Sequence, residues 1–139
     1  MKYDLIFYIS KKTGYCEKHL RRLFSARQYE ARSVTFASTP VDLGEKVCDS
    51  LRYCPLVIIV GGLRSPYDDN LSTVLSRVLS NSGLTLENMR KLRSSGKTSG
   101  YIIRYRNQIL LALPDEPRDI DAMLSDSVLR YIEAKTKPE

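Results

Sequence analysis

A glycine-rich loop carries the clearest chemical signal in this sequence. Gly61 and Gly62 follow the apolar run Leu56–Val60 directly, and Asp68 and Asp69 close the loop just before an amphipathic stretch. Glycines let backbone amides approach an anion closely, and the N-terminus of a following helix adds a favourable partial charge. The loop is therefore a candidate site for an oxyanion or a phosphate group.

The same residues also have a purely structural interpretation. Asp68 and Asp69 could cap a helix and complement its dipole, and their position alone favours this interpretation. The loop is not a P-loop, because no Gly-Lys-Ser/Thr follows, and it lacks the third glycine of a dinucleotide-binding fingerprint. A formal charge of +6 favours an anionic partner without naming it.

The predicted strands and helices on either side of the loop determine its position in the fold. The uninterrupted apolar run at 56–60 is typical of a strand covered on both faces, at the centre of a parallel sheet. Further strands are predicted at 3–9, 31–36, 101–105 and 109–113, of which the last two form a hairpin. Helices are predicted around Leu20, from Val41 and from Leu71, and a short one at 84–92. A single helix should follow Pro117 and carry the apolar residues from Ile120 to Ile132.

Strands that alternate with helices predict a single three-layer α/β/α domain with a mainly parallel sheet and a C-terminal β-hairpin. This domain should span residues 1–134, and residues 135–139 should form a frayed tail. In such sheets ligands bind beyond the carboxyl ends of the strands. Three loops meet that condition: 10–14, 61–69 and 114–117.

The whole pattern resembles the molybdopterin-binding domain family, which includes stand-alone molybdenum-cofactor biosynthesis proteins and the N-terminal domain of competence/damage-inducible proteins. In that family a buried strand runs into T-G-G-x-G-P-T-x-x-D-x-T, and a later strand runs into L-P-G-x-P. The matching segments here are V-G-G-L-R-S-P-Y-D-D-N-L at 60–71 and L-P-D-E-P at 113–117. The resemblance extends from about Lys2 to Ile132 and implies a divergent member with the molybdopterin-binding-like fold.

The resemblance also implies a function and a site. Family members bind the pterin and phosphate of molybdopterin, and some adenylylate it with ATP and Mg²⁺. The expected ligand is thus a phosphorylated pterin or a nucleotide in molybdenum cofactor biosynthesis, and Asp69 is the best catalytic and metal-binding candidate. The expected ligand-binding residues are Ser10, Lys11, Gly61, Gly62, Arg64, Ser65, Asp68, Asp69, Lys97, Pro114 and Asp115. Relatives are often trimers, which implies a homo-oligomer.

Departures from the family pattern argue against full adenylyltransferase activity. Arg64 and Asp115 stand at glycine positions, and Lys11 stands where stand-alone members commonly carry an acid. A side chain hinders the approach of backbone amides to a ligand, and a lysine is no ligand for Mg²⁺. The alternative is a degenerate, non-catalytic interaction or regulatory module of the same fold. The sequence leaves both hypotheses open.

Other function classes are disfavoured. Cys16, Cys48 and Cys54 show no C-x-x-C spacing and are expected to be reduced, mostly buried thiols. His19 is the sole histidine and is expected at the surface, without a metal. The longest apolar run is too short for a membrane span, so we expect a cytoplasmic protein. Nucleic-acid binding is disfavoured because no stacking-aromatic motif accompanies the basic residues.

Overall fold

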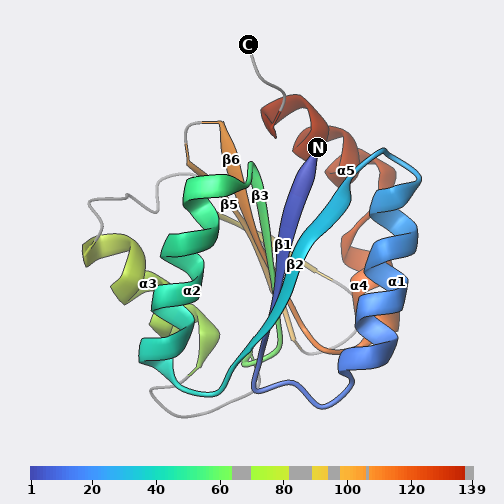
Figure 1. Ribbon diagram of the computed structural model, residues 1–139. Coiled ribbons are helices and arrows are strands. Elements are labelled where there is room, and N and C mark those ends of the chain that lie inside the picture. Colours follow the sequence, from blue (N-terminus) through green and yellow to red (C-terminus); the bar gives the residue numbers. More distant parts are fainter. Residues whose placement is uncertain (64–69, 82–88, 94–97, 106, 137–139) are drawn as a thin grey trace.

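A computed structural model describes residues 1–63, 70–81, 89–93, 98–105 and 107–136 (Figure 1). The elements in chain order are β1 (Lys2–Tyr8), α1 (Thr13–Ser25), β2 (Glu30–Ala37), α2 (Pro40–Tyr53), β3 (Leu56–Val60), α3 (Leu71–Asn81), β4 (Met89–Leu92), β5 (Gly100–Tyr105), β6 (Gln108–Leu113), α4 (Pro117–Met123) and α5 (Asp126–Thr136). Within the described residues, none of the helices has both the length and the apolar character needed to cross a membrane.

One sheet organises the chain. Its strand order is β2-β1-β3-β6-β5-β4, and the first four strands run parallel while β5 and β4 are antiparallel to their neighbours. All five residues of β3 are buried, and Ile58 is in register with Leu5 on one side and Leu111 on the other. The structure confirms the predicted interior position of β3 and the β5–β6 hairpin.

Helices cover both faces of the sheet (Figure 1). α1, α4 and α5 pack on one face, and α2 and α3 pack on the other. Side chains alternate along β1, so that Leu5 and Phe7 join the first apolar cluster while Ile6 and Tyr8 join the second. A strand that serves two cores cannot alternate between apolar and polar residues, which explains the continuous apolar runs.

The short helix predicted at 84–92 was wrong. Its residues 89–92 form the edge strand β4, in which Met89 pairs with Ile103. β4 satisfies backbone groups along the outer edge of β5, a demand that the local pattern of apolar residues does not reveal. Leu84 and Leu86 lie outside the described residues.

The predicted C-terminal helix is in fact two helices. α4 ends at Met123, and α5 begins at Asp126 after Ser125, whose hydroxyl accepts a hydrogen bond from the Val128 N–H at 3.4 Å. Such a serine starts a new helix instead of continuing the old one. α5 then runs to Thr136, beyond the expected domain end at residue 134.

The thiols are as predicted, whereas His19 has a structural partner. All three cysteines are free, with Cys16 and Cys54 buried. His19 Nε2 lies 2.8 Å from Asp121 Oδ1, and its side chain is 23% exposed. This contact joins α1 to α4 and leaves the imidazole less solvated than the sequence suggested.

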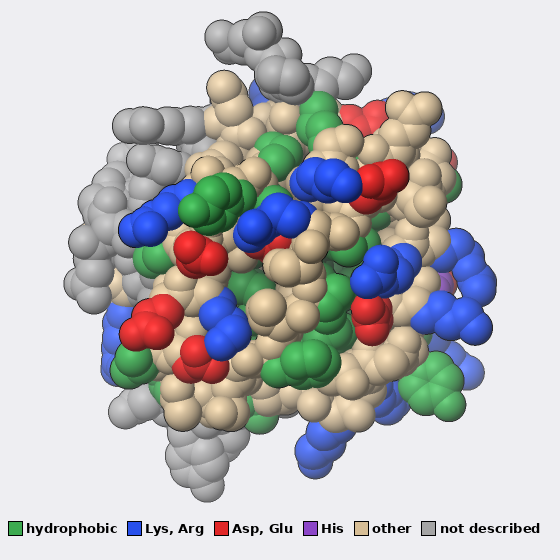
Figure 2. Space-filling view, in the orientation of Figure 1, with side chains coloured by type: hydrophobic (Ala, Val, Ile, Leu, Met, Phe, Trp, Pro, Cys, Tyr) green, Lys and Arg blue, Asp and Glu red, His purple; other side chains and the backbone are tan. Residues whose placement is uncertain are grey.

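A buried carboxylate ties β1 to the edge strand β2. Asp4 is fully buried and accepts hydrogen bonds from the Arg32 guanidinium at 3.0 and 2.5 Å and from Ser33 Oγ at 2.8 Å. Burial alone would raise the pKa of Asp4, but hydrogen bonds led by Arg32 reverse this effect and lower it below its usual value. Figure 2 shows that the face presented by β2 otherwise mixes acidic and basic side chains.

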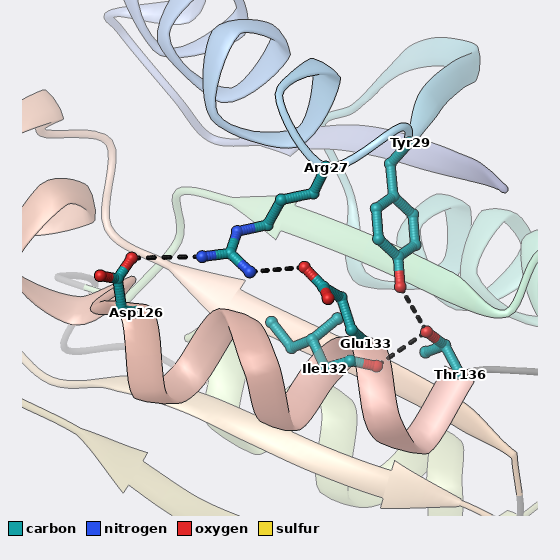
Figure 3. A network of polar contacts seen from close by, with 6 residues as sticks. All are labelled: Arg27, Tyr29, Asp126, Ile132, Glu133 and Thr136. Carbon is teal, nitrogen blue, oxygen red and sulfur yellow. Dashed lines mark hydrogen bonds and ion pairs between the residues drawn. The ribbon is translucent and has the colours of Figure 1, made fainter.

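A second polar network holds the C-terminal helix against the α1–β2 turn (Figure 3). Arg27 lies 2.5 Å from Glu133 Oε1 and 3.2 Å from Asp126 Oδ1, so its guanidinium bridges two positions of α5. The Thr136 hydroxyl donates to the Ile132 carbonyl at 2.7 Å, and Tyr29 Oη lies 2.6 Å from Thr136 Oγ1. Because the threonine proton is already used, Tyr29 donates to Thr136.

We expect Asp4→Asn to lower the free energy of unfolding by about 2 kcal/mol at pH 7, because a neutral amide replaces the buried carboxylate that accepts the hydrogen bonds of Arg32 and Ser33. Since the folded-state pKa of Asp4 is lowered, its contribution is complete above the unfolded value and disappears as the pH falls through the folded one. The difference between the variant and the natural protein, measured by urea unfolding, should therefore shrink at acid pH. The exposed Glu30→Gln is the matched control and should unfold like the natural protein at pH 7.

We expect Tyr29→Phe to lower the free energy of unfolding by about 1–2 kcal/mol, because the buried Thr136 oxygen loses its donor. The double variant Tyr29→Phe with Thr136→Val removes both polar groups. In a double-mutant cycle, the double variant should lower the free energy of unfolding by less than the sum of the two single variants. Strict additivity would show that the two hydroxyls do not interact.

Candidate anion-binding mouth at the carboxyl ends of the strands

Loops from three strand ends meet at one edge of the sheet. The Lys11 N–H donates to Asp115 Oδ2 at 3.0 Å, which joins the loop after β1 to the loop after β6. Beside it, Lys12 Nζ and Glu116 Oε2 form an ion pair at 2.6 Å. The Gly61 N–H, at the end of β3, donates to the Leu113 carbonyl at 2.9 Å. The described parts of the three predicted loops therefore converge.

A hollow of about 230 Å³ lies where these loops meet, and we call it the mouth. Its lining residues are Ile9, Lys11, Gly61, Gly62, Leu63, Pro114 and Asp115. Five of the residues predicted from the sequence lie in this lining: Lys11, Gly61, Gly62, Pro114 and Asp115. Ser10 lines an adjoining hollow instead. Arg64, Ser65, Asp68, Asp69 and Lys97 lie outside the described residues.

Packing against Tyr8 explains the two glycines. Gly61 and Gly62 have φ of 105° and 74°, a backbone conformation that side chains disfavour. A Cβ on Gly61 would collide with the Tyr8 carbonyl oxygen, and one on Gly62 would collide with the Tyr8 ring. The chain leaves β3 so close to the end of β1 that both positions require glycine, whether or not a ligand binds.

Asp115 has a role that its sequence position did not reveal. Its carboxylate accepts the Lys11 N–H and lies beside the mouth, so it is both a structural clamp and a negative charge in the lining. Burial, and then the charges of Asp115 and Glu116, raise the pKa of the nearby Cys16 thiol to about 11. Cys16 is therefore protonated and unreactive at neutral pH.

Sequence reasoning missed two features beside the mouth. Ile9 has φ of 48°, which is unusual for a β-branched residue and stores strain. Next to it, the Ser10 hydroxyl oxygen is buried and has no hydrogen-bond partner among the described residues. No local pattern predicts a positive φ at an isoleucine, so this strain becomes visible only in three dimensions.

The described part of the mouth does not fit a magnesium site. It holds one carboxylate, Asp115, which already accepts a backbone N–H and lies beside Lys11. Mg²⁺ prefers several oxygen ligands, and a neighbouring ammonium opposes its charge. Among the described residues, no cluster of three or more histidine, cysteine or acidic side chains could hold a metal ion.

The arrangement is similar to several solved structures. The protein CinA of unknown function from Thermoplasma acidophilum matches with a TM-score of 0.71 and 14% identity, over 98% of each chain. The molybdopterin biosynthesis enzyme MoaB from Thermus thermophilus matches with a TM-score of 0.70 and 16% identity, over 99% of this chain and 98% of that one. MogA matches with a TM-score of 0.65 and 16% identity, over 97% of this chain and 99% of that one.

The chain adopts the molybdopterin-binding fold. Nearly complete coverage in both directions confirms the architecture that the sequence resemblance implied. No family model matches the sequence, and no curated protein is similar to it in sequence. At 14–16% identity these three similarities establish the fold, and the residues of the mouth must carry any argument about function.

We expect Gly61→Ala to lower the free energy of unfolding by roughly 3 kcal/mol or more, because backbone strain adds to the collision with Tyr8. Gly14→Ala is the matched control. Gly14 lies in the first turn of α1 with no atom within 4 Å of an added Cβ, so alanine there should be neutral or stabilising by up to about 1 kcal/mol. Thermal and urea unfolding measure both, and equal effects would contradict this account of Gly61.

Proposed function

We propose that this protein binds a small phosphorylated ligand, a pterin phosphate or a nucleotide, at the mouth. The observation that carries the proposal is the convergence of three strand-end loops around a hollow that contains the exposed Lys11. Parallel sheets bind ligands at this edge because loops and helix N-termini gather there. The fold shared with the molybdopterin biosynthesis enzyme MoaB supports this placement and favours molybdenum cofactor biosynthesis as the setting.

Two charged side chains in the lining of the mouth, Lys11 and Asp115, would act on a bound phosphate in opposite ways. Lys12 is neutralised by Glu116, whereas the Lys11 ammonium has no ion-pair partner among the described residues. Lys11 can therefore pair with a phosphate, an interaction that a charge-assisted hydrogen bond strengthens. Asp115 opposes the same phosphate because its negative charge lies in the lining. The proposal thus assigns attraction to Lys11 and discrimination to Asp115.

The test is a titration of the protein with inorganic phosphate, followed by calorimetry or amide chemical shifts. Lys11→Ala should raise the Kd for phosphate about tenfold through loss of a charged contact. Asp115→Asn keeps an oxygen acceptor for the Lys11 N–H and removes the charge. It should lower the Kd about fivefold, since repulsion across partly wet protein is worth about 1 kcal/mol.

Lys91→Ala is the control, because this exposed lysine lies on the distant edge strand β4. It should leave the Kd for phosphate unchanged. Equal effects of Lys91→Ala and Lys11→Ala would reduce the binding to general surface charge and contradict the proposed site.

ATP-dependent adenylylation of molybdopterin should be absent or very weak. Lys11 replaces a carboxylate of stand-alone family members, and Asp115 replaces a glycine and adds a charge that repels phosphate. An adenylyl-transfer assay with purified protein, molybdopterin, ATP and Mg²⁺ measures this directly. Turnover that matches a competent family member and disappears in Asp69→Ala would restore the enzymatic hypothesis.

One observation favours the alternative of a non-catalytic interaction or regulatory module. The Asp115 and Glu116 contacts join the loops around the mouth through the protein's own groups, as a permanently assembled surface would require. In either case we expect a cytoplasmic homo-oligomer, a trimer by the family resemblance. Light scattering of the purified protein measures that state.

A further inference from the structure

The outer face of α1 carries a stripe of exposed side chains, which we call the basic stripe. Tyr15, Lys18 and Arg22 follow one another at spacings of three and four residues, on the side of the helix away from the buried Leu20. Tyr15 is 76% exposed. Neither Lys18 nor Arg22 has an ion-pair partner in the described part of the chain, so the stripe presents two unbalanced positive charges.

The outer face of α2 carries a matching stripe of opposite charge, the acidic stripe. Val41, Glu45 and Asp49 stand four residues apart, on the side of the helix away from the buried Val47. Val41 is 73% exposed. Glu45 and Asp49 form no ion pair with any described residue, so their two negative charges are also unbalanced.

The two stripes share one order along the chain. Each begins with a large apolar side chain and continues with two charges of one sign, four residues or about 6 Å apart. Within the described residues, Tyr15 and Val41 are also the most exposed large apolar side chains. Apolar surface of this kind is stabilised when another surface covers it. The stripes are therefore complementary in charge, in spacing and in the place of their apolar residue.

The stripes cannot meet within one molecule. α1 and α2 lie on opposite faces of the sheet, on either side of the edge strand β2 (Figure 1). In the view onto β2, basic side chains gather on the α1 side and acidic ones on the α2 side (Figure 2). Each stripe must therefore find its complement on another molecule.

The direction of the helices fits a contact between copies. α1 connects β1 to β2 and α2 connects β2 to β3, and these three strands are parallel, so both helices run the same way. Rotation about an axis parallel to the helices preserves their direction. α1 of one copy would then meet α2 of the next in parallel, as the shared order of the stripes requires. A two-fold contact between two α1 helices would instead place like charges together.

We propose that the basic stripe of each molecule packs against the acidic stripe of a second copy of this chain. Such a head-to-tail contact builds a closed ring when the rotation between copies closes. The inference goes beyond the proposed function and does not rest on it, because the contact needs no ligand. The paired side chains are Lys18 with Glu45, Arg22 with Asp49, and Tyr15 with Val41.

Neighbouring charges do not oppose this contact. Arg21 and Asp42, which flank the stripes, are each paired within their own helix. Arg52 lies one turn beyond Asp49, and in this register it falls opposite the uncharged Ser25.

Sedimentation velocity at two salt concentrations tests the contact. The protein should be assembled at an ionic strength of about 0.02 M and dissociate at about 0.5 M, because salt screens surface ion pairs. Glu45→Lys with Asp49→Lys should raise the protein concentration for half-assembly by about tenfold or more at low salt. Lys18→Glu with Arg22→Glu should have the same effect. A variant with all four reversals should assemble again, because every pair regains opposite charges.

Lys91→Glu with Arg93→Glu is the control for charge. Both residues are exposed at the edge strand β4, at the other end of the sheet from β2, and their reversal changes the net charge as much as that of the basic stripe. This variant should assemble like the natural protein. Circular dichroism checks that each variant is folded.

Tyr15→Ser tests the apolar part of the contact. Because Tyr15 is so exposed, the substitution should leave the unfolding midpoint of the monomer at high salt unchanged, while it weakens assembly at low salt. Met89→Ser, on β4, is the control and should change neither assembly nor its salt dependence.

Three outcomes would overturn the inference. The first is a monomer at low salt and millimolar protein concentration, and binding of poly-glutamate by that monomer would assign the basic stripe to a different acidic partner. The second is full assembly of both double variants. The third is a folded fourfold variant that stays dissociated. Phosphate binding at the mouth is titrated separately, so its failure would contradict the proposed function and leave this contact standing.

Discussion

Burial of β3 on both faces is the constraint on which the rest of this structure depends. Five consecutive apolar residues cannot face water on either side, so the strand must lie inside the sheet with helices above and below it. That requirement places β1 and β6 beside it in parallel. The carboxyl ends of these strands then reach one edge together. The mouth is therefore a geometrical consequence of how the core is buried.

The turn that follows β3 connects the packed core to the loops around the mouth. Gly61 and Gly62 turn the chain against Tyr8, and the Gly61 N–H bonds to the end of β6. Asp115 then joins the loop after β6 to the loop after β1 through the Lys11 N–H. The same carboxylate lies in the lining of the mouth, so one side chain both joins the loops and sets the charge of the hollow.

Three residues at the carboxyl ends of β1 and β2 depart from ordinary conformational and burial preferences. Ile9 adopts a backbone conformation that it disfavours, Ser10 buries a hydroxyl without a partner among the described residues, and Phe36 exposes an aromatic ring. Each of these costs free energy in a protein that only needs to fold. The donors gathered around the buried Asp4 show the contrasting case of a polar group that is fully paired. Departures that gather beside a hollow are typical of binding sites.

The sequence by itself determined the features that depend on near neighbours along the chain. Examples are the apolar run of β3 and the hairpin of β5 and β6. Only the tertiary structure decided which groups from distant segments meet. It made residues 89–92 a strand because β5 needed a partner, and it buried Thr136 because Tyr29 supplied a donor. It also gave Asp115 its role as a clamp, since this role depends on the Lys11 N–H, which lies 104 residues away in sequence and 3.0 Å away in space.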